Sequence, residues 1–333
     1  MLALIREKNA NVALRPVDAP EIGAPEDVKI KIQYCTLCRD DMHVNDKFTI
    51  FYGIVGHEAA GVVVEAGKEA EQHGFRPGGR VVLFPVSSCG KCACCLSQQP
   101  QYCPEVHLMP GVLAEYVVRS YKQLIPLPDR YTFQQGCLME PVGDVLEALR
   151  KVEPAFSSDV LLFGGGFIGQ VMLRVLLSLG VKQVAVVEPL EDRRQLALRH
   201  GAAAAFDSDD PDLQVKLLQC TGFRGFNLVI DTSARTDIFD FSLPCVTHGA
   251  SFLLTAYNDV YAKLSLPVLH MYTGNIRIAW SCLCGKNTME SAMHIIERLR
   301  LQDLITVEYP FAKSDQAYRR YLGTDELKIG IAF

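Results

Sequence analysis

The chain has 333 residues, of which 49% are hydrophobic and 21% are charged, so it buries a sizeable core and is neither disordered nor fibrous. At roughly 100–200 residues per domain, this length suits two domains. A formal net charge of -5 leaves no surplus of cations to neutralise phosphates, so neither nucleic acid nor an anionic membrane is an expected partner. We expect a small-molecule ligand.

The N-terminus and the cysteines indicate a compartment. Charged residues within the first eight positions come too early for a secretory signal, and no apolar run approaches the roughly 20 residues that span a bilayer. We therefore expect a soluble, cytoplasmic protein. In that setting, 12 cysteines favour metal binding and thiolate chemistry over disulfides.

The first third of the chain has the pattern of short strands. Residues 28–35 alternate apolar and polar side chains with period two, which predicts a strand buried on one face. Further strands are predicted at 61–64, 80–84 and 115–118, separated by Gly and Pro. This region is therefore expected to be an all-β, loop-rich unit.

After about residue 140 the pattern changes to alternating strands and helices. Strands are predicted at 160–163, 183–187, 227–230, 251–254 and 276–280, with helices at 167–179 and 191–200. Such alternation is typical of a mostly parallel sheet built from βαβ units. An amphipathic helix is expected near 289–301, in a C-terminal stretch that suggests no domain by itself.

Four cysteines form the strongest motif: Cys89, Cys92, Cys95 and Cys103. Thiolates at this CxxCxxC…C spacing close a tetrahedron around one Zn²⁺ and leave no position for substrate, so the predicted site is structural. Cys94 falls outside the spacing and is interpreted as a bystander. The alternative is a cluster of free or disulfide-bonded thiols.

A glycine-rich segment follows the predicted strand 160–163 and opens an apolar helix. The GxGxxG pattern there consists of Gly164, Gly165, Gly166, Phe167, Ile168 and Gly169. A strand, glycine turn and helix place free backbone N–H groups and a positive helix end where a pyrophosphate binds. The alternative is an ordinary glycine turn in a doubly wound sheet.

Glu188 lies at the end of the next predicted strand, about 20 residues after the glycines. A carboxylate there hydrogen-bonds the adenosine ribose and repels a 2′-phosphate, which favours NAD over NADP. Arg193 and Arg194 weaken that inference, because a nearby cation accommodates the phosphate.

Polar residues scattered through the β-rich region include candidate ligands of a second, catalytic zinc. They are Cys38, Asp40, Asp41, His43, His57, Glu58 and Glu140. A catalytic zinc takes three protein ligands and keeps a position open, so one thiolate, one imidazole and one carboxylate suffice. Taken singly, each residue also has an ordinary structural explanation, such as a helix-start carboxylate for Glu140.

Together these motifs resemble the zinc-containing medium-chain dehydrogenase/reductase superfamily. The four-cysteine segment, the sequence GHEAAG at 56–61, GVLAEY at 111–116 and the glycine fingerprint occur in that family's order. The resemblance implies an α/β protein with a GroES-like β-rich catalytic domain, residues 1–139 and 284–333, whose structural-zinc lobe covers about 85–105. A Rossmann-type doubly wound parallel sheet would occupy residues 140–283.

Glu140-Pro141 resembles the polyol (sorbitol) dehydrogenase branch of this family. The resemblance implies a catalytic zinc held by Cys38, His57 and Glu140, with Glu58 able to approach the metal. Cys137 is the competing ligand. A second, structural zinc would bind the four-cysteine lobe.

The resemblance also assigns supporting roles. Asp41 matches a carboxylate that hydrogen-bonds the zinc histidine, His43 matches the end of a proton relay, and Arg193 matches an arginine beside the adenosine of NAD. Asp40 departs from the family, which has Ser or Thr there. An ionised carboxylate only accepts hydrogen bonds, so Asp40 is a candidate general base or a binder of a cationic group; the alternative is that water replaces it in the relay.

The function implied is hydride transfer between NAD(P) and a secondary alcohol or ketone of a polyol, cyclitol or amino-sugar-like compound. The alternatives are an NAD(P)H-dependent reductase of an activated C=C or C=N bond in the same fold, and a non-catalytic zinc-binding protein. The family usually forms dimers or tetramers through the edge of the cofactor-domain sheet, so we expect a homodimer or homotetramer.

Overall fold

A computed structural model describes residues 1–7, 11–42, 53–109, 111–257 and 261–333. The chain divides into two compact units, one formed by Met1–Gly143 with Cys284–Phe333 and the other by Asp144–Leu283. The boundary falls inside helix α4 (Met139–Arg150), whereas the sequence placed it at 139/140, where the strand pattern ends. The change in sequence pattern near residue 140 marks the start of α4. Residues 139–143 of this helix still belong to the first unit, so the boundary between the units falls later than the change in pattern.

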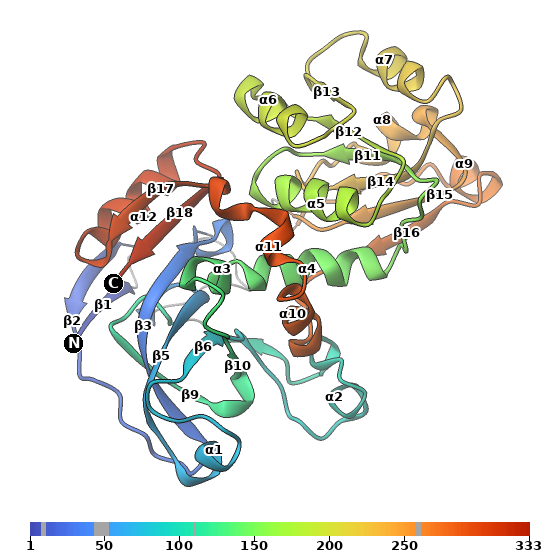
Figure 1. Cartoon of the computed structure of the whole chain (residues 1–333). Coiled ribbons are helices and arrows are strands. Elements are labelled where there is room, and N and C mark those ends of the chain that lie inside the picture. Colours follow the sequence, from blue (N-terminus) through green and yellow to red (C-terminus); the bar gives the residue numbers. More distant parts are fainter. Residues whose placement is uncertain (8–10, 43–52, 110, 258–260) are drawn as a thin grey trace. The chain divides into compact units, whose positions relative to one another are not determined.

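The first unit is built around an antiparallel sheet that β17 extends in parallel (Figure 1). In spatial order its strands are β10 (Leu124–Pro126), β6 (Arg80–Leu83), β5 (Glu58–Ala66), β3 (Asp27–Leu37), β18 (Lys328–Ala332) and β17 (Ile305–Pro310), and β9 (Tyr116–Ser120) also pairs with β3. A smaller sheet contains β2 (Val12–Pro16), β1 (Leu2–Arg6) and β4 (Gly53–Ile54), and β7 (Val86–Ser87) pairs with β8 (His107–Leu108). The predicted alternation of β3 is confirmed, because Val28, Ile30 and Ile32 are fully buried.

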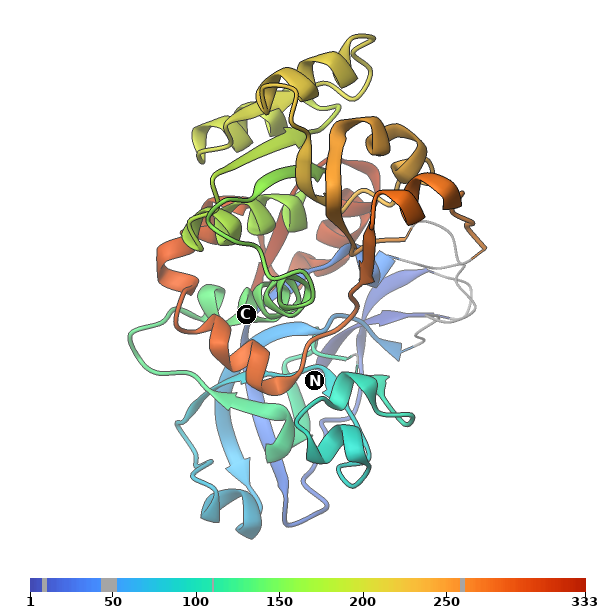
Figure 2. The same ribbon diagram turned by 90° about the vertical axis from the view of Figure 1, so that its right-hand side faces the viewer.

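Short helices connect these strands. The α-helices are α1 (Lys68–Gln72), α2 (Ala93–Leu96), α3 (Phe133–Cys137), α4, α10 (Lys286–Ala292), α11 (Ile296–Leu299) and α12 (Ser314–Gly323). The 3₁₀ turns are η1 (Arg39–Met42), η2 (Pro100–Tyr102), η3 (Tyr121–Gln123), η5 (Leu301–Leu304) and η6 (Phe311–Lys313). Figure 2 shows the segment that carries α2 as a loop-rich projection from its unit.

The second unit contains a parallel sheet. Its strands, in spatial order, are β13 (Ala204–Phe206), β12 (Gln183–Val187), β11 (Asp159–Phe163), β14 (Phe226–Asp231), β15 (Val246–Leu254) and β16 (Arg277–Trp280). Its helices are α5 (Phe167–Ser178), α6 (Glu191–Arg199), α7 (Leu213–Cys220), α8 (Ile238–Ser242) with the 3₁₀ turn η4 (Leu243–Cys245), and α9 (Val268–Thr273). In sequence terms the strand order is 3-2-1-4-5-6, that of a Rossmann-type sheet, so this prediction is confirmed.

The predicted helix over 289–301 is wrong as a single element. The N–H groups of residues 293–295 form i→i−3 hydrogen bonds, such as the bond from Met293 N–H to the Glu290 carbonyl at 3.1 Å. This tighter geometry separates α10 from α11. Arg300 then adopts a left-handed conformation with φ of 49° and ends α11.

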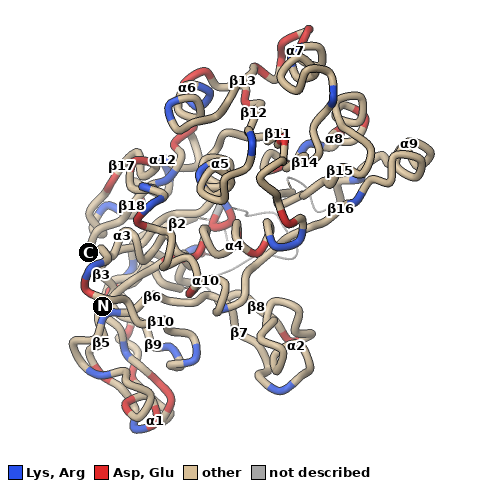
Figure 3. The backbone as a smooth tube through the Cα atoms, turned by 45° about the vertical axis from the view of Figure 1, so that its right-hand side comes forward, with Lys and Arg blue, Asp and Glu red and all other residues tan. Residues whose placement is uncertain are grey.

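Two further observations bear on the expected partners. No described helix is long and apolar enough to cross a bilayer. Among the described residues, basic and acidic positions are interspersed along the backbone of both units, without a long run of basic positions (Figure 3). The charge pattern therefore agrees with a small-molecule ligand.

Candidate active site

The four predicted structural-zinc cysteines lie together in the lobe between β7 and β8. The sulfur atoms of Cys89, Cys92, Cys95 and Cys103 all lie within 4.8 Å of one another. Cys89 and Cys95 sulfurs are 3.9 Å apart, and those of Cys92 and Cys95 are 3.5 Å apart. A Zn–S bond of about 2.3 Å gives a tetrahedral edge of about 3.8 Å, so these separations fit one zinc ion.

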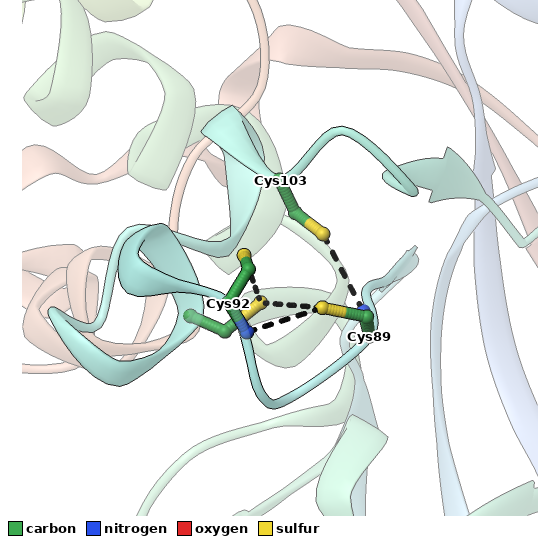
Figure 4. Close-up of side chains that lie close together, drawn as sticks. Cys89, Cys92 and Cys103 are labelled. Atoms are coloured by element: carbon green, nitrogen blue, oxygen red, sulfur yellow. Dashed lines mark hydrogen bonds between the residues drawn. The ribbon is translucent and has the colours of Figure 1, made fainter.

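Hydrogen bonds to the sulfur atoms favour thiolates at Cys89 and Cys95, whereas at Cys92 a backbone hydrogen bond is outweighed by burial and the neighbouring cysteine sulfurs, which raise the pKa of that thiol to about 12. Cys103 Sγ accepts hydrogen bonds from the Cys89 and Glu105 N–H groups at 3.5 and 3.3 Å, and Cys89 Sγ accepts from Cys92 N–H at 3.4 Å (Figure 4). A hydrogen bond from Ser88 lowers the pKa of the Cys95 thiol to about 6. Such donors stabilise the deprotonated sulfur that a metal requires.

A second group of metal-binding side chains lies in the same unit. Ligand atoms of Cys38, His57 and Glu58 lie within 4.8 Å of one another. Cys38 follows β3, and His57 and Glu58 lie where β5 begins beside it, so antiparallel pairing of these strands brings residues 19 positions apart together. Thiolate, imidazole and carboxylate are ligands that zinc accepts in an open catalytic site.

Asp41 fixes the orientation of two of these residues. Its Oδ1 lies 2.9 Å from His57 Nδ1, and its Oδ2 accepts a hydrogen bond from the Cys38 N–H at 2.9 Å. Because Nδ1 of His57 is engaged by Asp41, Nε2 is the ring nitrogen left for a metal. The turn η1, which carries Asp41, thus organises both the thiol and the imidazole.

Burial and neighbouring charges set the protonation of this group. Burial raises the pKa of the Cys38 thiol to about 12, and the Asp40 carboxylate adds to the rise. Burial opposes a charged imidazole at His57, but Asp41 outweighs it and raises the pKa of His57 well above its ordinary value. Cys38 is therefore a thiol unless a cation binds beside it.

Glu58 already has a charged partner. Its Oε1 lies 2.6 Å from Lys328 Nζ, both side chains are buried, and Thr36 donates a hydrogen bond to its Oε2. Burial disfavours the ammonium, but Glu58 outweighs this effect and raises the pKa of Lys328 above its ordinary value. The carboxylate that clusters with the ligand atoms of Cys38 and His57 is thus held in a buried ion pair.

The two remaining ligand candidates, Glu140 and Cys137, are not part of this group. Glu140 is buried at the second position of α4, in the same unit, and the described ligand cluster does not include it. Cys137 Sγ donates to the Tyr34 carbonyl at 3.1 Å, so the competing thiol is directed at β3.

Of the two residues expected to transfer a proton, Asp40 and His43, the structure describes only Asp40. Asp40 is exposed within η1, two residues from Cys38, and is close enough to affect the pKa of that thiol. His43 lies outside the described residues.

The glycine fingerprint adopts the predicted strand–turn–helix geometry. Gly164 follows β11 with φ of 94°, a conformation that favours glycine, and Gly166 caps α5. A Cβ at Gly169 would lie 1.9 Å from the Gly164 carbonyl oxygen, so only glycine allows α5 to begin this close to β11. Phe167 and Ile168 lie in the first turn of the helix, and the N-terminus of a helix generally favours an anion.

Glu188 lies at the end of β12 beside this loop. Its Oε2 accepts from Gly165 N–H at 2.6 Å, and its Oε1 lies 3.8 Å from the Arg193 guanidinium. Arg194 is turned to other groups: it donates to the carbonyls of Glu188 and Pro189 and pairs with the Glu191 and Asp207 carboxylates.

Comparison with known proteins identifies the family. The Alcohol dehydrogenase GroES-like domain matches residues 24–129, and the Zinc-binding dehydrogenase domain matches residues 168–298. The chain is 30% identical to 2-dehydro-3-deoxy-L-galactonate 5-dehydrogenase of Pseudoalteromonas atlantica over 69% of this chain and 67% of that protein. It is 26% identical to D-arabinitol dehydrogenase 1 of Uromyces fabae over 99% and 97% of the two chains.

The fold agrees with these matches. Galactitol-1-phosphate dehydrogenase from Escherichia coli superposes with a TM-score of 0.89 at 22% identity, covering all of both chains. The chain belongs to the zinc-containing medium-chain dehydrogenase/reductase superfamily. Within it, the relatives confirm the predicted polyol dehydrogenase-like branch, a class of zinc-dependent NAD(P) alcohol dehydrogenases.

Several residues that shape this dehydrogenase site were missed by sequence reasoning. They are Thr36, Lys328, Tyr318 and Arg6. A lysine at the head of the apolar run 328–332 was a signal that a charge is buried there. Thr36, Tyr318 and Arg6 carry no comparable sequence signal.

Proposed function

We propose that this chain transfers a hydride between NAD and a secondary alcohol or ketone of a polyol, cyclitol or amino-sugar-like compound. The observation that carries the proposal is the junction of Cys38, His57 and Asp41, in which the Asp41 carboxylate holds both the main-chain N–H of Cys38 and the buried imidazole of His57. When bound, zinc would supply Lewis acidity toward the substrate oxygen, and NAD(P) would accept or give the hydride.

Cys38, His57 and Glu140 are the proposed zinc ligands. Glu58 is the alternative carboxylate, but its charge is already balanced by Lys328 at 2.6 Å, so binding a metal requires it to leave a buried ammonium. Glu140 is buried in the same unit, and the resemblance to the polyol dehydrogenase branch places the third zinc ligand there. Glu140→Ala should therefore remove one zinc per chain, whereas Glu58→Gln should retain both; the reverse result would assign the ligand to Glu58.

Asp40 is proposed to accept the substrate proton and pass it toward His43. Its support is position: it is exposed in the turn between Cys38 and Asp41. Asp40→Ser restores the hydroxyl that the family carries there. If the rate and its pH profile are unchanged in that variant, Asp40 is not the base and water serves the relay.

NAD is the proposed cofactor, bound by the glycine loop, Glu188 and Arg193. Glu188 is buried at the strand end, where a carboxylate accepts from ribose hydroxyls and repels a 2′-phosphate. Arg194 is held by internal partners, and Arg193 faces the same carboxylate that would repel the phosphate. These contacts support NAD rather than NADP.

We also propose that the protein is a homodimer or homotetramer and that it is located in the cytoplasm. Strand β16 is an edge of the parallel sheet, and Trp280 on it and Val268, Leu269 and Tyr272 on α9 are exposed. Exposed apolar groups beside an edge strand favour association. None of the 12 cysteines forms a disulfide, which suits a reducing compartment.

One set of measurements tests the function. Zinc content is determined on the purified chain, NADH and NADPH are titrated by fluorescence, and polyols, inositols and amino-cyclitols are screened with NAD at the absorbance of the reduced cofactor. Two zinc ions, cofactor binding and polyol oxidation support the proposal. Reduction of a C=C or C=N bond without alcohol oxidation would favour the alternative reductase, for which the relatives described above give no support, and one zinc without cofactor binding would favour a non-catalytic protein.

A further inference from the structure

A buried chain of hydrogen bonds leads from the C-terminal helix to the zinc-ligand turn. Arg6 on β1 donates from its NH2 to the Tyr318 hydroxyl at 2.5 Å, and that hydroxyl donates to the Asp41 carbonyl at 2.9 Å. Arg6 and Tyr318 are each 2% exposed, so water does not substitute for either contact. The chain ends on the residue whose carboxylate contacts both Cys38 and His57.

The same helix holds the turn at a second point. Arg39, at the start of η1, donates to the carbonyls of Tyr321 and Thr324 at 2.5 and 2.8 Å, where α12 ends. Its guanidinium also lies 4.1 Å from the centre of the Tyr321 ring. The turn is thus tied to α12 on both sides of Asp40.

We propose that Tyr318, held by Arg6, is a positioning residue of the candidate zinc site. It fixes the main chain of Asp41, and because the Asp41 carboxylate bridges the Cys38 N–H and His57 Nδ1, it fixes two ligands at once. The inference rests on the zinc site proposed above. The side-chain hydrogen bonds of Tyr318 in the described part of the chain go to Arg6 and Asp41, so its effect passes through Asp41.

The same unit contains a second arginine–tyrosine–carbonyl arrangement at other residues, with an exposed arginine in place of the buried Arg6. Arg130 NH2 donates to the Tyr131 hydroxyl at 2.7 Å, and that hydroxyl donates to the Met293 carbonyl at 2.8 Å. Tyr131 is also 2% exposed. Tyr131→Phe therefore removes the same arginine–tyrosine–carbonyl link as Tyr318→Phe and controls for the loss of one buried hydroxyl.

The test measures the kinetics of zinc release from the intact chain to a colorimetric chelator. With two zinc sites, release should have two kinetic phases, and the phase that is lost in Cys38→Ser belongs to the catalytic site. Tyr318→Phe should release that zinc about tenfold faster than wild type, the size of effect typical of groups that orient metal ligands. Release from the Cys89–Cys103 lobe should be unchanged. Tyr131→Phe should match wild type in both phases.

Equal catalytic-site rates in Tyr318→Phe and Tyr131→Phe would overturn the positioning role. Should Tyr318→Phe fail to fold, Arg6→Lys is measured in the same way: faster release than in Tyr131→Phe supports the inference, and an equal rate rejects it. A wild-type chain that lacks the phase assigned by Cys38→Ser would reject the proposed zinc site itself, and with it this role.

Discussion

Lys328 Nζ lies 2.6 Å from Glu58 Oε1, and both side chains are about 1% exposed. A buried ion pair is strongly destabilising when one partner is removed, because the other charge is left without compensation. Lys328→Met should therefore lower the free energy of unfolding by about 3–5 kcal/mol, measured by urea denaturation. The double variant Lys328→Met with Glu58→Gln should recover most of that loss, since neither member of the pair is then charged.

The same pair predicts a dependence of stability on alkaline pH. The pKa of Lys328 is raised above its value of about 10.4 in an unfolded chain, so its contribution is complete below that pH and is lost as the pH rises further. Unfolding at pH 8 and pH 11 should thus differ more in wild type than in the double variant. An equal difference in both proteins would show that Lys328 is not the group responsible.

The structural lobe offers a prediction with a control only a few residues away. Cys103→Ser should reduce zinc from two ions per chain to one, because Cys103 is one of four sulfurs within 4.8 Å of one another. Cys94→Ser should retain both ions, since Cys94 lies on α2 outside that group. Zinc is measured by atomic absorption; two ions in Cys103→Ser would remove the lobe from the metal sites.

The features that could be predicted from the sequence are those formed by residues close together along the chain. The four lobe cysteines fall within 15 residues, and Gly164–Gly169 connects one strand to the next helix, so spacing alone was sufficient. The Glu58–Lys328 and Asp41–Tyr318 contacts join residues 270 and 277 positions apart. Only the pairing of β18 with β3 and the packing of α12 bring them together, and the C-terminal stretch that forms these elements suggested no domain by itself.

Glu188 should determine the choice of cofactor. Glu188→Gln keeps the length of the side chain and an oxygen for Gly165 N–H, but removes the charge that repels a 2′-phosphate. The ratio of NADPH to NADH dissociation constants should shift toward NADPH by about tenfold, or about 1.4 kcal/mol. Asp192→Asn, an equal charge change at an exposed position of α6, is the control and should leave the ratio unchanged.

The exposed edge of the parallel sheet leads to a prediction about assembly. Val268 on α9 is 71% exposed, and α9 carries no Lys, Arg, Asp or Glu (Figure 3). In an assembly that uses this edge of the sheet, a carboxylate at position 268 of each subunit would bring like charges together. Val268→Glu should weaken self-association about tenfold or more, as measured by light scattering over a dilution series. Val215→Glu on α7, where the side chain is 51% exposed, should associate like wild type. If Val268→Glu and Val215→Glu associate equally, the subunits meet at another surface, because the charge added on α9 would then remain in water.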